Sequence, residues 1–183
     1  MRLLVFLHGT AIMHAGAVGR SREQRVAQVK AGTDPSGRDY AAYVPVGDAV
    51  AKLRRWQEQG ARIDYLSSRR SAEDVVVLER HGFSPGRLLF RQASESYADV
   101  VARAAPDILI EDDCESIGAA EMAYPQLSPE ARSRIVWIVV PEFGGFGGLP
   151  DSLHELEGVA RRLADAVDLR LGVHGGEDGV ERG

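Results

Sequence analysis

Three groups of polar residues, each directly after a short apolar segment, carry side chains suited to chemistry. They are His8, Gly9 and Thr10, then Ser67, Ser68 and Arg69, then Glu111, Asp112 and Asp113. Arg91 follows a fourth segment, and Glu142 a fifth. Hydroxyl and guanidinium groups bind phosphate, and clustered carboxylates hold hard cations such as Mg²⁺. If these groups converge, they form a site for a phosphate and a cation.

Five apolar segments of strand length would position these groups. They are residues 3–7, 62–66, 87–90, 107–110 and 135–140. Continuous apolar runs without alternation are typical of parallel strands that are buried on both faces. In such a sheet the ligand binds beyond the carboxyl ends of the strands. The polar groups named above therefore should meet at one edge.

Helical patterns separate the strands. Apolar residues recur at helical spacing over 49–56, and Gly60 follows as a helix end. Ser71 and Asp74 resemble the N-terminal cap of a second helix. Residues 97–104 predict a third helix, which ends before Pro106. A capping box from Ser152 to Glu155 opens a regular helix that extends to Val167. The alternation predicts an α/β fold, a Rossmann-like doubly wound parallel sheet of five strands. We expect one domain over residues 1–171 and a flexible tail over 172–183.

Composition narrows the classes of partner. The chain of 183 residues carries 22 basic and 27 acidic residues, a net charge of −5, which argues against nucleic acid. No apolar stretch is long enough to span a membrane, and the apolar run at residues 3–7 is too short for a secretory signal. The single cysteine, Cys114, excludes an intramolecular disulfide. We expect a cytoplasmic protein without a membrane or nucleic-acid partner.

The strand-end motifs resemble those of the haloacid dehalogenase-like (HAD) superfamily over roughly residues 2–140. That family has an apolar strand followed by Asp-x-Asp-Gly-Thr, and here the strand, Gly9 and Thr10 match. Ser67 matches the Ser or Thr after the second strand, and Glu111-Asp112 match the later acidic pair. The resemblance implies a hydrolase with Mg²⁺. From the resemblance together with the chemistry of the residues, we expect catalytic roles for His8, Thr10 and Asp112, phosphate contacts from Gly9, Ser67, Ser68, Arg69 and Arg91, and metal ligation by Glu111, Asp112 and Asp113.

Two departures change the expected chemistry. Phe6 stands where the family has its nucleophilic Asp, and His8 stands where it has its acid–base Asp. Phe6 can neither form an aspartyl-phosphate nor ligate a metal. The family's third motif is a Lys, but the only lysines are Lys30 and Lys52, outside the expected region near Tyr97. A phosphate clamp must therefore come from arginine.

Several alternatives remain open for the individual residues. His8 is either a substitute acid–base or nucleophile, or a strand-end histidine hydrogen-bonded to the backbone. The carboxylates need either Mg²⁺ or an arginine partner such as Arg69 or Arg91. Ser67 and Ser68 either bind phosphate or cap the next helix. His14 lies near His8 in sequence, but the spacing does not suit a zinc site.

Two functions follow. The first is a divergent hydrolase acting on a small phosphorylated metabolite, and the second is a catalytically inactive protein that binds a ligand or partner. Different chemistry on the same scaffold is a third reading. Residues 11–46 form a small cap insertion with one helix, which begins at a capping box from Ser21 to Gln24. The composition of residues 34–39 predicts a turn. So short a cap predicts an open site or one closed by a second subunit, as in a homodimer.

Overall fold

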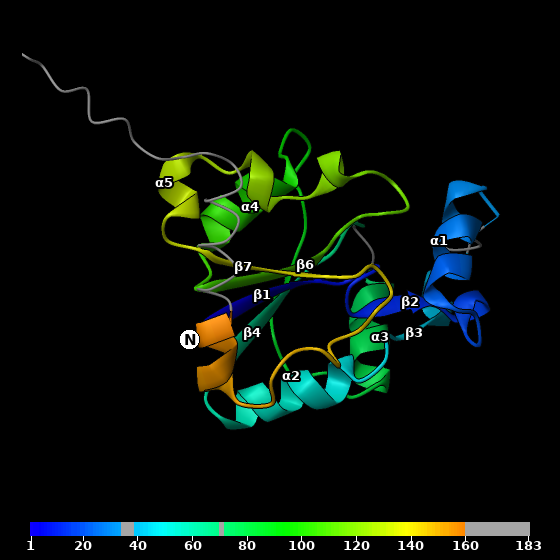
Figure 1. Ribbon diagram of the computed structural model, residues 1–183, viewed down its shortest axis with the longest axis horizontal. Helices are drawn as coiled ribbons and strands as arrows, with labels where there is room; N and C mark the ends of the chain where they lie inside the picture. Colours follow the sequence, from blue (N-terminus) through cyan, green and yellow to red (C-terminus); the bar gives the residue numbers. More distant parts are fainter. Residues whose placement is uncertain (34–38, 70–71, 160–183) are drawn as a thin grey trace, which may run out of the picture.

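A five-stranded parallel sheet forms the centre of the computed structural model, which describes residues 1–33, 39–69 and 72–159. The strand order is β5-β4-β1-β6-β7 (Figure 1). The strands are β1 (Arg2–Phe6), β4 (Arg62–Leu66), β5 (Leu88–Leu89), β6 (Ile108–Asp112) and β7 (Val136–Val140). The predicted α/β class and the five parallel strands are confirmed.

Two helical layers cover the sheet, because its strands are apolar on both faces. Leu3 and Val5 of β1 face one side, where they pack with Leu53 and Trp56 of α2 (Ala49–Glu58) and with α3 (Glu73–Arg80). Leu4 faces the other side, toward α4 (Tyr97–Ala104) and residues 123–135, which include α5 (Pro129–Arg132). Figure 1 shows α4 and α5 on one side of the sheet and α2 on the other.

Most helix ends follow local rules, but neither α2 nor α3 has a side-chain cap at its N-terminus. Gly60 and Gly82 have φ of +98° and +66° just beyond α2 and α3, as glycine allows. The residue at the N-terminal cap of α3 is Ala72, which makes no side-chain cap bond; Ser71 lies outside the described residues. Residues 153–159 are helical, and Ser152 accepts a hydrogen bond from the Glu155 amide at 3.3 Å. The expected continuation to Val167 and the tail at 172–183 lie outside the described residues.

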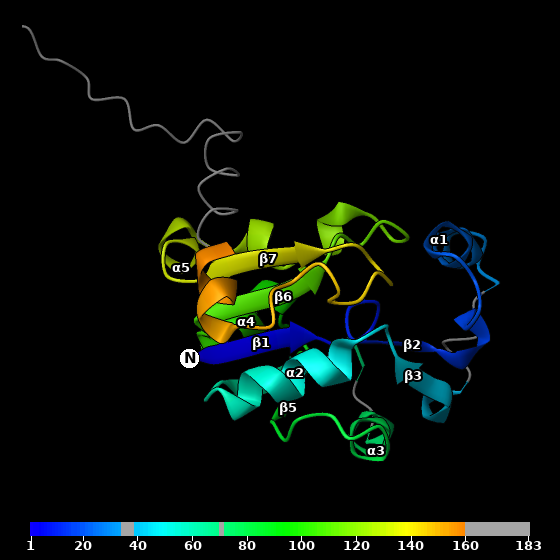
Figure 2. The same ribbon diagram turned by 60° about the horizontal axis from the view of Figure 1, so that its bottom comes forward.

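Residues 11–33 and 39–46 build a small lobe beyond the carboxyl ends of the strands (Figure 2). It contains the antiparallel pair β2 (Ile12–His14) and β3 (Tyr43–Pro45), the short 3-10 turns η1 (Ala15–Ala17) and η3 (Tyr40–Ala42), and α1 (Arg22–Lys30). The predicted capping box from Ser21 to Gln24 is present. The strand pair was not expected, since three-residue strands leave no periodic signal. Residues 34–38 of the expected turn lie outside the described part of the chain.

Glu111 is a buried acid inside β6, on the face that packs against α4. Its two carboxylate oxygens accept hydrogen bonds from the amides of Ala123 and Tyr124, at 2.8 and 3.0 Å. Burial raises the pKa of Glu111 to about 7, although these two amides act in the opposite direction. Glu111 therefore anchors the loop after β6 to the sheet. Among the described residues no helix is long and apolar enough to cross a membrane.

We expect Glu111→Ala to destabilise the fold, because it would leave two buried amides without an acceptor. Each unsatisfied buried group costs roughly 1–3 kcal/mol. The free energy of unfolding in urea should fall by about that amount per amide, whereas Glu130→Ala, at an exposed position, should change it by less than about 0.5 kcal/mol. Equal stability of the two variants would show that Glu111 does not anchor the loop.

Candidate functional site

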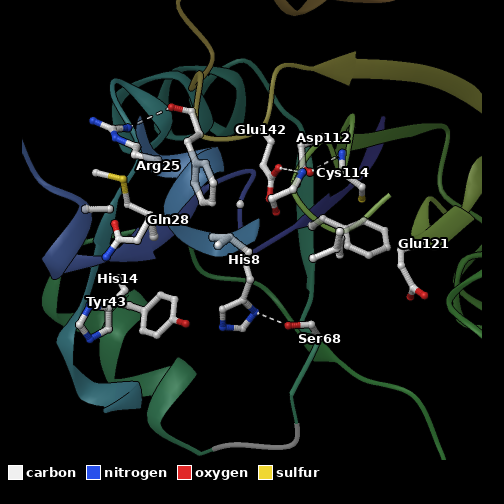
Figure 3. A pocket seen from close by; sticks show the side chains of 18 of the residues that line it. His8, His14, Arg25, Gln28, Tyr43, Ser68, Asp112, Cys114, Glu121 and Glu142 are labelled. Atoms are coloured by element: carbon white, nitrogen blue, oxygen red, sulfur yellow. Dashed lines mark hydrogen bonds between the residues drawn. The ribbon is translucent and has the colours of Figure 1, made fainter. Parts of the chain in front are cut away.

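A pocket of about 220 Å³ lies between the carboxyl edge of the sheet and the lobe. The sheet side contributes His8, Ser68, Asp112 and Glu142, which follow or end four different strands (Figure 3). The lobe contributes a second wall, which includes His14, Arg25, Gln28 and Tyr43. The short insertion thus covers part of the site without a second subunit.

Three carboxylates that could bind a metal ion lie at one side of the pocket, which Asp112 and Glu142 line. Oxygen atoms of Asp112, Asp113 and Glu142 lie within 4.8 Å of one another, and Asp112 and Glu142 are buried. Thr10 donates its hydroxyl to Asp112 Oδ2 at 2.6 Å, and the Cys114 amide donates to Oδ1 at 2.9 Å. Thr10 therefore orients a carboxylate and is itself fully buried.

Glu111 does not belong to this cluster, although the sequence placed it there. Side chains alternate along a strand, so adjacent Glu111 and Asp112 point to opposite faces of the sheet. Glu142, just past β7, takes the expected place of Glu111. It was visible in the sequence as a strand-end acid, but β7 had to be placed beside β6 before its role could be seen.

The buried carboxylates lack full charge compensation. Burial raises the pKa of Asp112, against the effect of its bonds to Thr10 and Cys114. Burial likewise raises the pKa of Glu142, despite two bonds from Ser116, and the charges of Asp112 and Asp113 add to the rise. The arginine partner is Arg22, 3.0 Å from Asp113, rather than Arg69 or Arg91. A further cation would relieve the remaining repulsion.

Gly9 allows the first strand to approach these acids closely. Its φ is +85°, and a Cβ atom at this position would lie 2.9 Å from Asp112 Oδ2. Next to the cluster, burial raises the pKa of the Cys114 thiol, and the nearby carboxylates add to this effect. Cys114 therefore stays protonated at neutral pH and is a poor nucleophile.

His8 occupies the opposite side of the pocket, between two side chains. Its Nδ1 atom lies 2.9 Å from the Ser68 hydroxyl, and its Nε2 atom lies 3.3 Å from Asp74 Oδ1. The ring also meets Tyr43 edge-to-face, with ring centroids 5.1 Å apart. His8 thus bonds to side chains instead of the backbone contact considered from sequence.

The two serines after β4 have different roles because they point to different sides. Ser68 is exposed to the pocket, whereas Ser67 is buried and its hydroxyl lies 2.5 Å from Asp74 Oδ2. Ser67 therefore holds Asp74 and does not line the main pocket. The sequence predicts only a helix-cap role for Asp74, and its position next to His8 depends on the tertiary fold.

Two of the arginines near the site line the main pocket, and a third lies outside it. Arg69 lines the main pocket, with its guanidinium 5.0 Å from the centre of the Tyr43 ring. Arg91 lies outside this pocket, over the ring of Tyr97 at 4.1 Å. Arg25 of α1 lines the main pocket and bonds to the Phe143 carbonyl at 3.1 Å. No sequence pattern points to Arg25, because only the fold of the lobe turns its side chain toward the pocket.

Phe6 forms part of the apolar wall and meets Tyr97 edge-to-face at 5.3 Å. The position that the resemblance assigns to a nucleophile is therefore a packing residue. Any nucleophile in this pocket must come from another residue or from water.

Asp74→Asn should lower stability in a pH-dependent way. Burial acts to raise the pKa of Asp74, but His8, Ser67 and Arg69, which face it, together hold the pKa below its ordinary 3.8. A lowered pKa means that the carboxylate stabilises the fold above about pH 4 and loses this effect as pH falls through the folded-state pKa. The difference in unfolding free energy between wild type and variant should be about 2 kcal/mol at pH 6 and shrink toward pH 3. A difference that is constant or grows toward pH 3 would contradict an ionised Asp74.

A scan against protein-family models gave no match, and a search of curated proteins found no similar sequence. The geometry described above is therefore the basis for any functional assignment. It shows a parallel α/β fold with an acidic cluster that could hold a metal ion, facing a histidine and two arginines across one pocket.

Proposed function

We propose that the protein is a hydrolase of small phosphorylated molecules, with His8 as the acid–base group and Mg²⁺ held by Asp112, Asp113 and Glu142. The observation that carries the proposal is the convergence of three kinds of group on one pocket. A cluster of acids suited to a cation, a histidine with a carboxylate partner, and two arginines all line it or border it. We regard the resemblance to the HAD superfamily as consistent with this proposal, with the histidine replacing lost aspartate chemistry.

The acidic cluster suits Mg²⁺ by its chemistry. All three side chains offer oxygen ligands, and burial of Asp112 and Glu142 without enough positive charge favours a bound cation. When bound, Mg²⁺ would offset negative charge on the phosphate and on its leaving oxygen. Arg25 and Arg69 would hold the remaining phosphate oxygens, since a guanidinium binds two of them at once.

His8 would move the proton in this reaction. Asp74, behind the ring, stabilises the form in which Nε2 carries a proton, which leaves Nδ1 on the pocket side as the base. A water or hydroxyl group near Ser68 can then give its proton to Nδ1, while Asp74 balances the positive charge that forms. Phe6 excludes the aspartyl-phosphate route at its position.

One observation favours the alternative, a binding protein without catalysis. Every oxygen of the three clustered carboxylates already accepts a hydrogen bond from the protein, and Arg22 pairs with Asp113. In that case the cluster ties the lobe to the sheet and the pocket only binds its ligand. Metal binding and turnover separate the two functions.

Metal binding should appear as thermal stabilisation. A ligand at 100 times its Kd adds about 2.7 kcal/mol to the stability of the folded state. We expect Mg²⁺ together with inorganic phosphate to raise the melting temperature of the wild type, Asp112→Asn to remove most of the rise, and Glu130→Gln, an exposed control, to retain it. No shift at millimolar Mg²⁺, or the same shift in Asp112→Asn, would contradict a cation on this cluster.

Catalysis should depend on His8. On a panel of phosphate monoesters with Mg²⁺, His8→Asn should lower kcat by about 10²- to 10⁴-fold, the range that a general acid–base contributes. The melting temperature in the absence of ligand serves as the folding control. Turnover unaffected by His8→Asn would contradict its role, and Mg²⁺ and phosphate binding without turnover in the wild type would favour the binding function.

A further inference from the structure

We propose that Ser68, His8 and Asp74 form a second, metal-independent catalytic unit, in which Ser68 is a nucleophile toward small carboxylic esters. This inference goes beyond the phosphate chemistry proposed above: it shares His8 and Asp74 with that proposal, but it places the nucleophile on Ser68 and needs no cation. It rests on a contiguous chain of three side chains that come from three segments of the fold. Ser68 follows β4, His8 follows β1, and Asp74 lies in the first turn of α3.

The hydrogen-bond directions in this chain follow from Asp74. Its pKa lies below the ordinary value, so the carboxylate is ionised and can only accept a hydrogen bond. It therefore favours the histidine tautomer with the proton on Nε2, 3.3 Å away. Nδ1 is then an acceptor, and the hydroxyl of Ser68, 2.9 Å from it, must donate. A serine that donates to a histidine nitrogen backed by a buried carboxylate is an activated nucleophile.

Burial adds an independent observation. Asp74 is fully buried, and its Oδ1 atom has no hydrogen-bond partner within the described residues; the same holds for His8 Nε2. These two buried atoms face each other, so a small shift closes them into a bond. Ser67 holds the other oxygen of Asp74 at 2.5 Å, which fixes the carboxylate toward the histidine.

The surroundings of Ser68 favour an ester with a small apolar acyl group. The pocket walls include Phe6, Met13, Val29, Ile117 and Phe143, and the volume of about 220 Å³ admits only a short chain. Asp112, Glu121 and Glu142 also line the pocket and would repel a phosphate dianion when no cation is bound. A neutral ester avoids this repulsion. Arg69, the next residue after Ser68, also lines the pocket and is the nearest source of positive charge in sequence for an oxyanion.

The reaction balances without a cofactor. Ser68 Oγ attacks the carbonyl carbon and its proton passes to His8 Nδ1; the bond to the alcohol oxygen then breaks, and His8 returns the proton to the departing alkoxide. Water next attacks the acyl-Ser68 carbonyl and gives a proton to Nδ1. The bond to Ser68 Oγ breaks, Oγ takes the proton back, and the carboxylic acid leaves. Asp74 acts throughout as a positioning residue.

Covalent labelling tests the nucleophile directly. The full chain in EDTA is treated with a fluorophosphonate, and intact mass and peptide mapping locate the adduct. We expect one adduct, on Ser68, absent from Ser68→Ala and strongly slowed in His8→Asn. Ser133→Ala, remote from the pocket, is the control and should label like the wild type. Ser68 is exposed, so its truncation should leave the melting temperature unchanged. No adduct on the wild type, or equal labelling of Ser68→Ala, overturns the proposal.

Ester hydrolysis provides the second measurement. Wild type should hydrolyse p-nitrophenyl butyrate in EDTA, and Asp74→Asn should lower kcat by roughly 10³- to 10⁴-fold with little change in KM. A purely structural role for Asp74 would lower the amount of folded protein but leave kcat per folded molecule unchanged. Hydrolysis that requires Mg²⁺ and survives Ser68→Ala overturns the proposal and leaves the phosphate function standing. Conversely, EDTA-resistant labelling without any Mg²⁺ effect supports Ser68 while the phosphate function fails.

Discussion

The parallel pairing of β1 with β4 on one side and β6 on the other determines where each group of the pocket lies. The three strands end at the same edge, so His8 emerges between Ser68 and Asp112. The pocket therefore has two chemically different sides. Toward β4 lie the serine, the histidine and, through α3, Asp74; toward β6 and β7 lie the acids. The two proposed chemistries share His8 and Asp74, but only the phosphate chemistry uses the acids near β6 and β7, and only the ester chemistry uses Ser68 as a nucleophile.

Charge links the lobe to the sheet. Arg22 of α1 reaches Asp113 and the carbonyl of Glu142, and Arg25 reaches the carbonyl of Phe143. The acids that could hold a cation thus also hold the wall that covers the pocket. Asp112 and Glu142 are buried and have raised pKa values, so the arginines do not fully compensate the negative charge of the cluster. A cation at the cluster would stabilise the acids and the lobe contact together.

The period of a β-strand explains why neighbours in sequence have unlike roles. Glu111 and Asp112 are adjacent, yet one anchors a loop across the sheet face and the other enters the pocket. After β4, Ser67 turns inward to Asp74 and Ser68 faces the pocket. A sequence motif that counts both residues of such a pair therefore cannot tell which side chain anchors the fold and which one lines the pocket. The resemblance at Ser67 and Glu111 identified the correct segments but not the side chains that line the cavity.

The sequence by itself determined the sheet, most helix boundaries and the edge at which the site lies, because apolar periodicity, glycine and capping residues act over short distances. It also established that position 6, at the end of the first strand, carries no carboxylate. Only the tertiary structure decided which polar groups meet. Asp74 approaches His8 because α3 packs beside β1, Glu142 joins Asp112 because β7 pairs with β6, and Arg25 lines the pocket because the lobe folds over the edge. These contacts depend on strand order and packing, which join residues far apart in the chain and leave no local pattern.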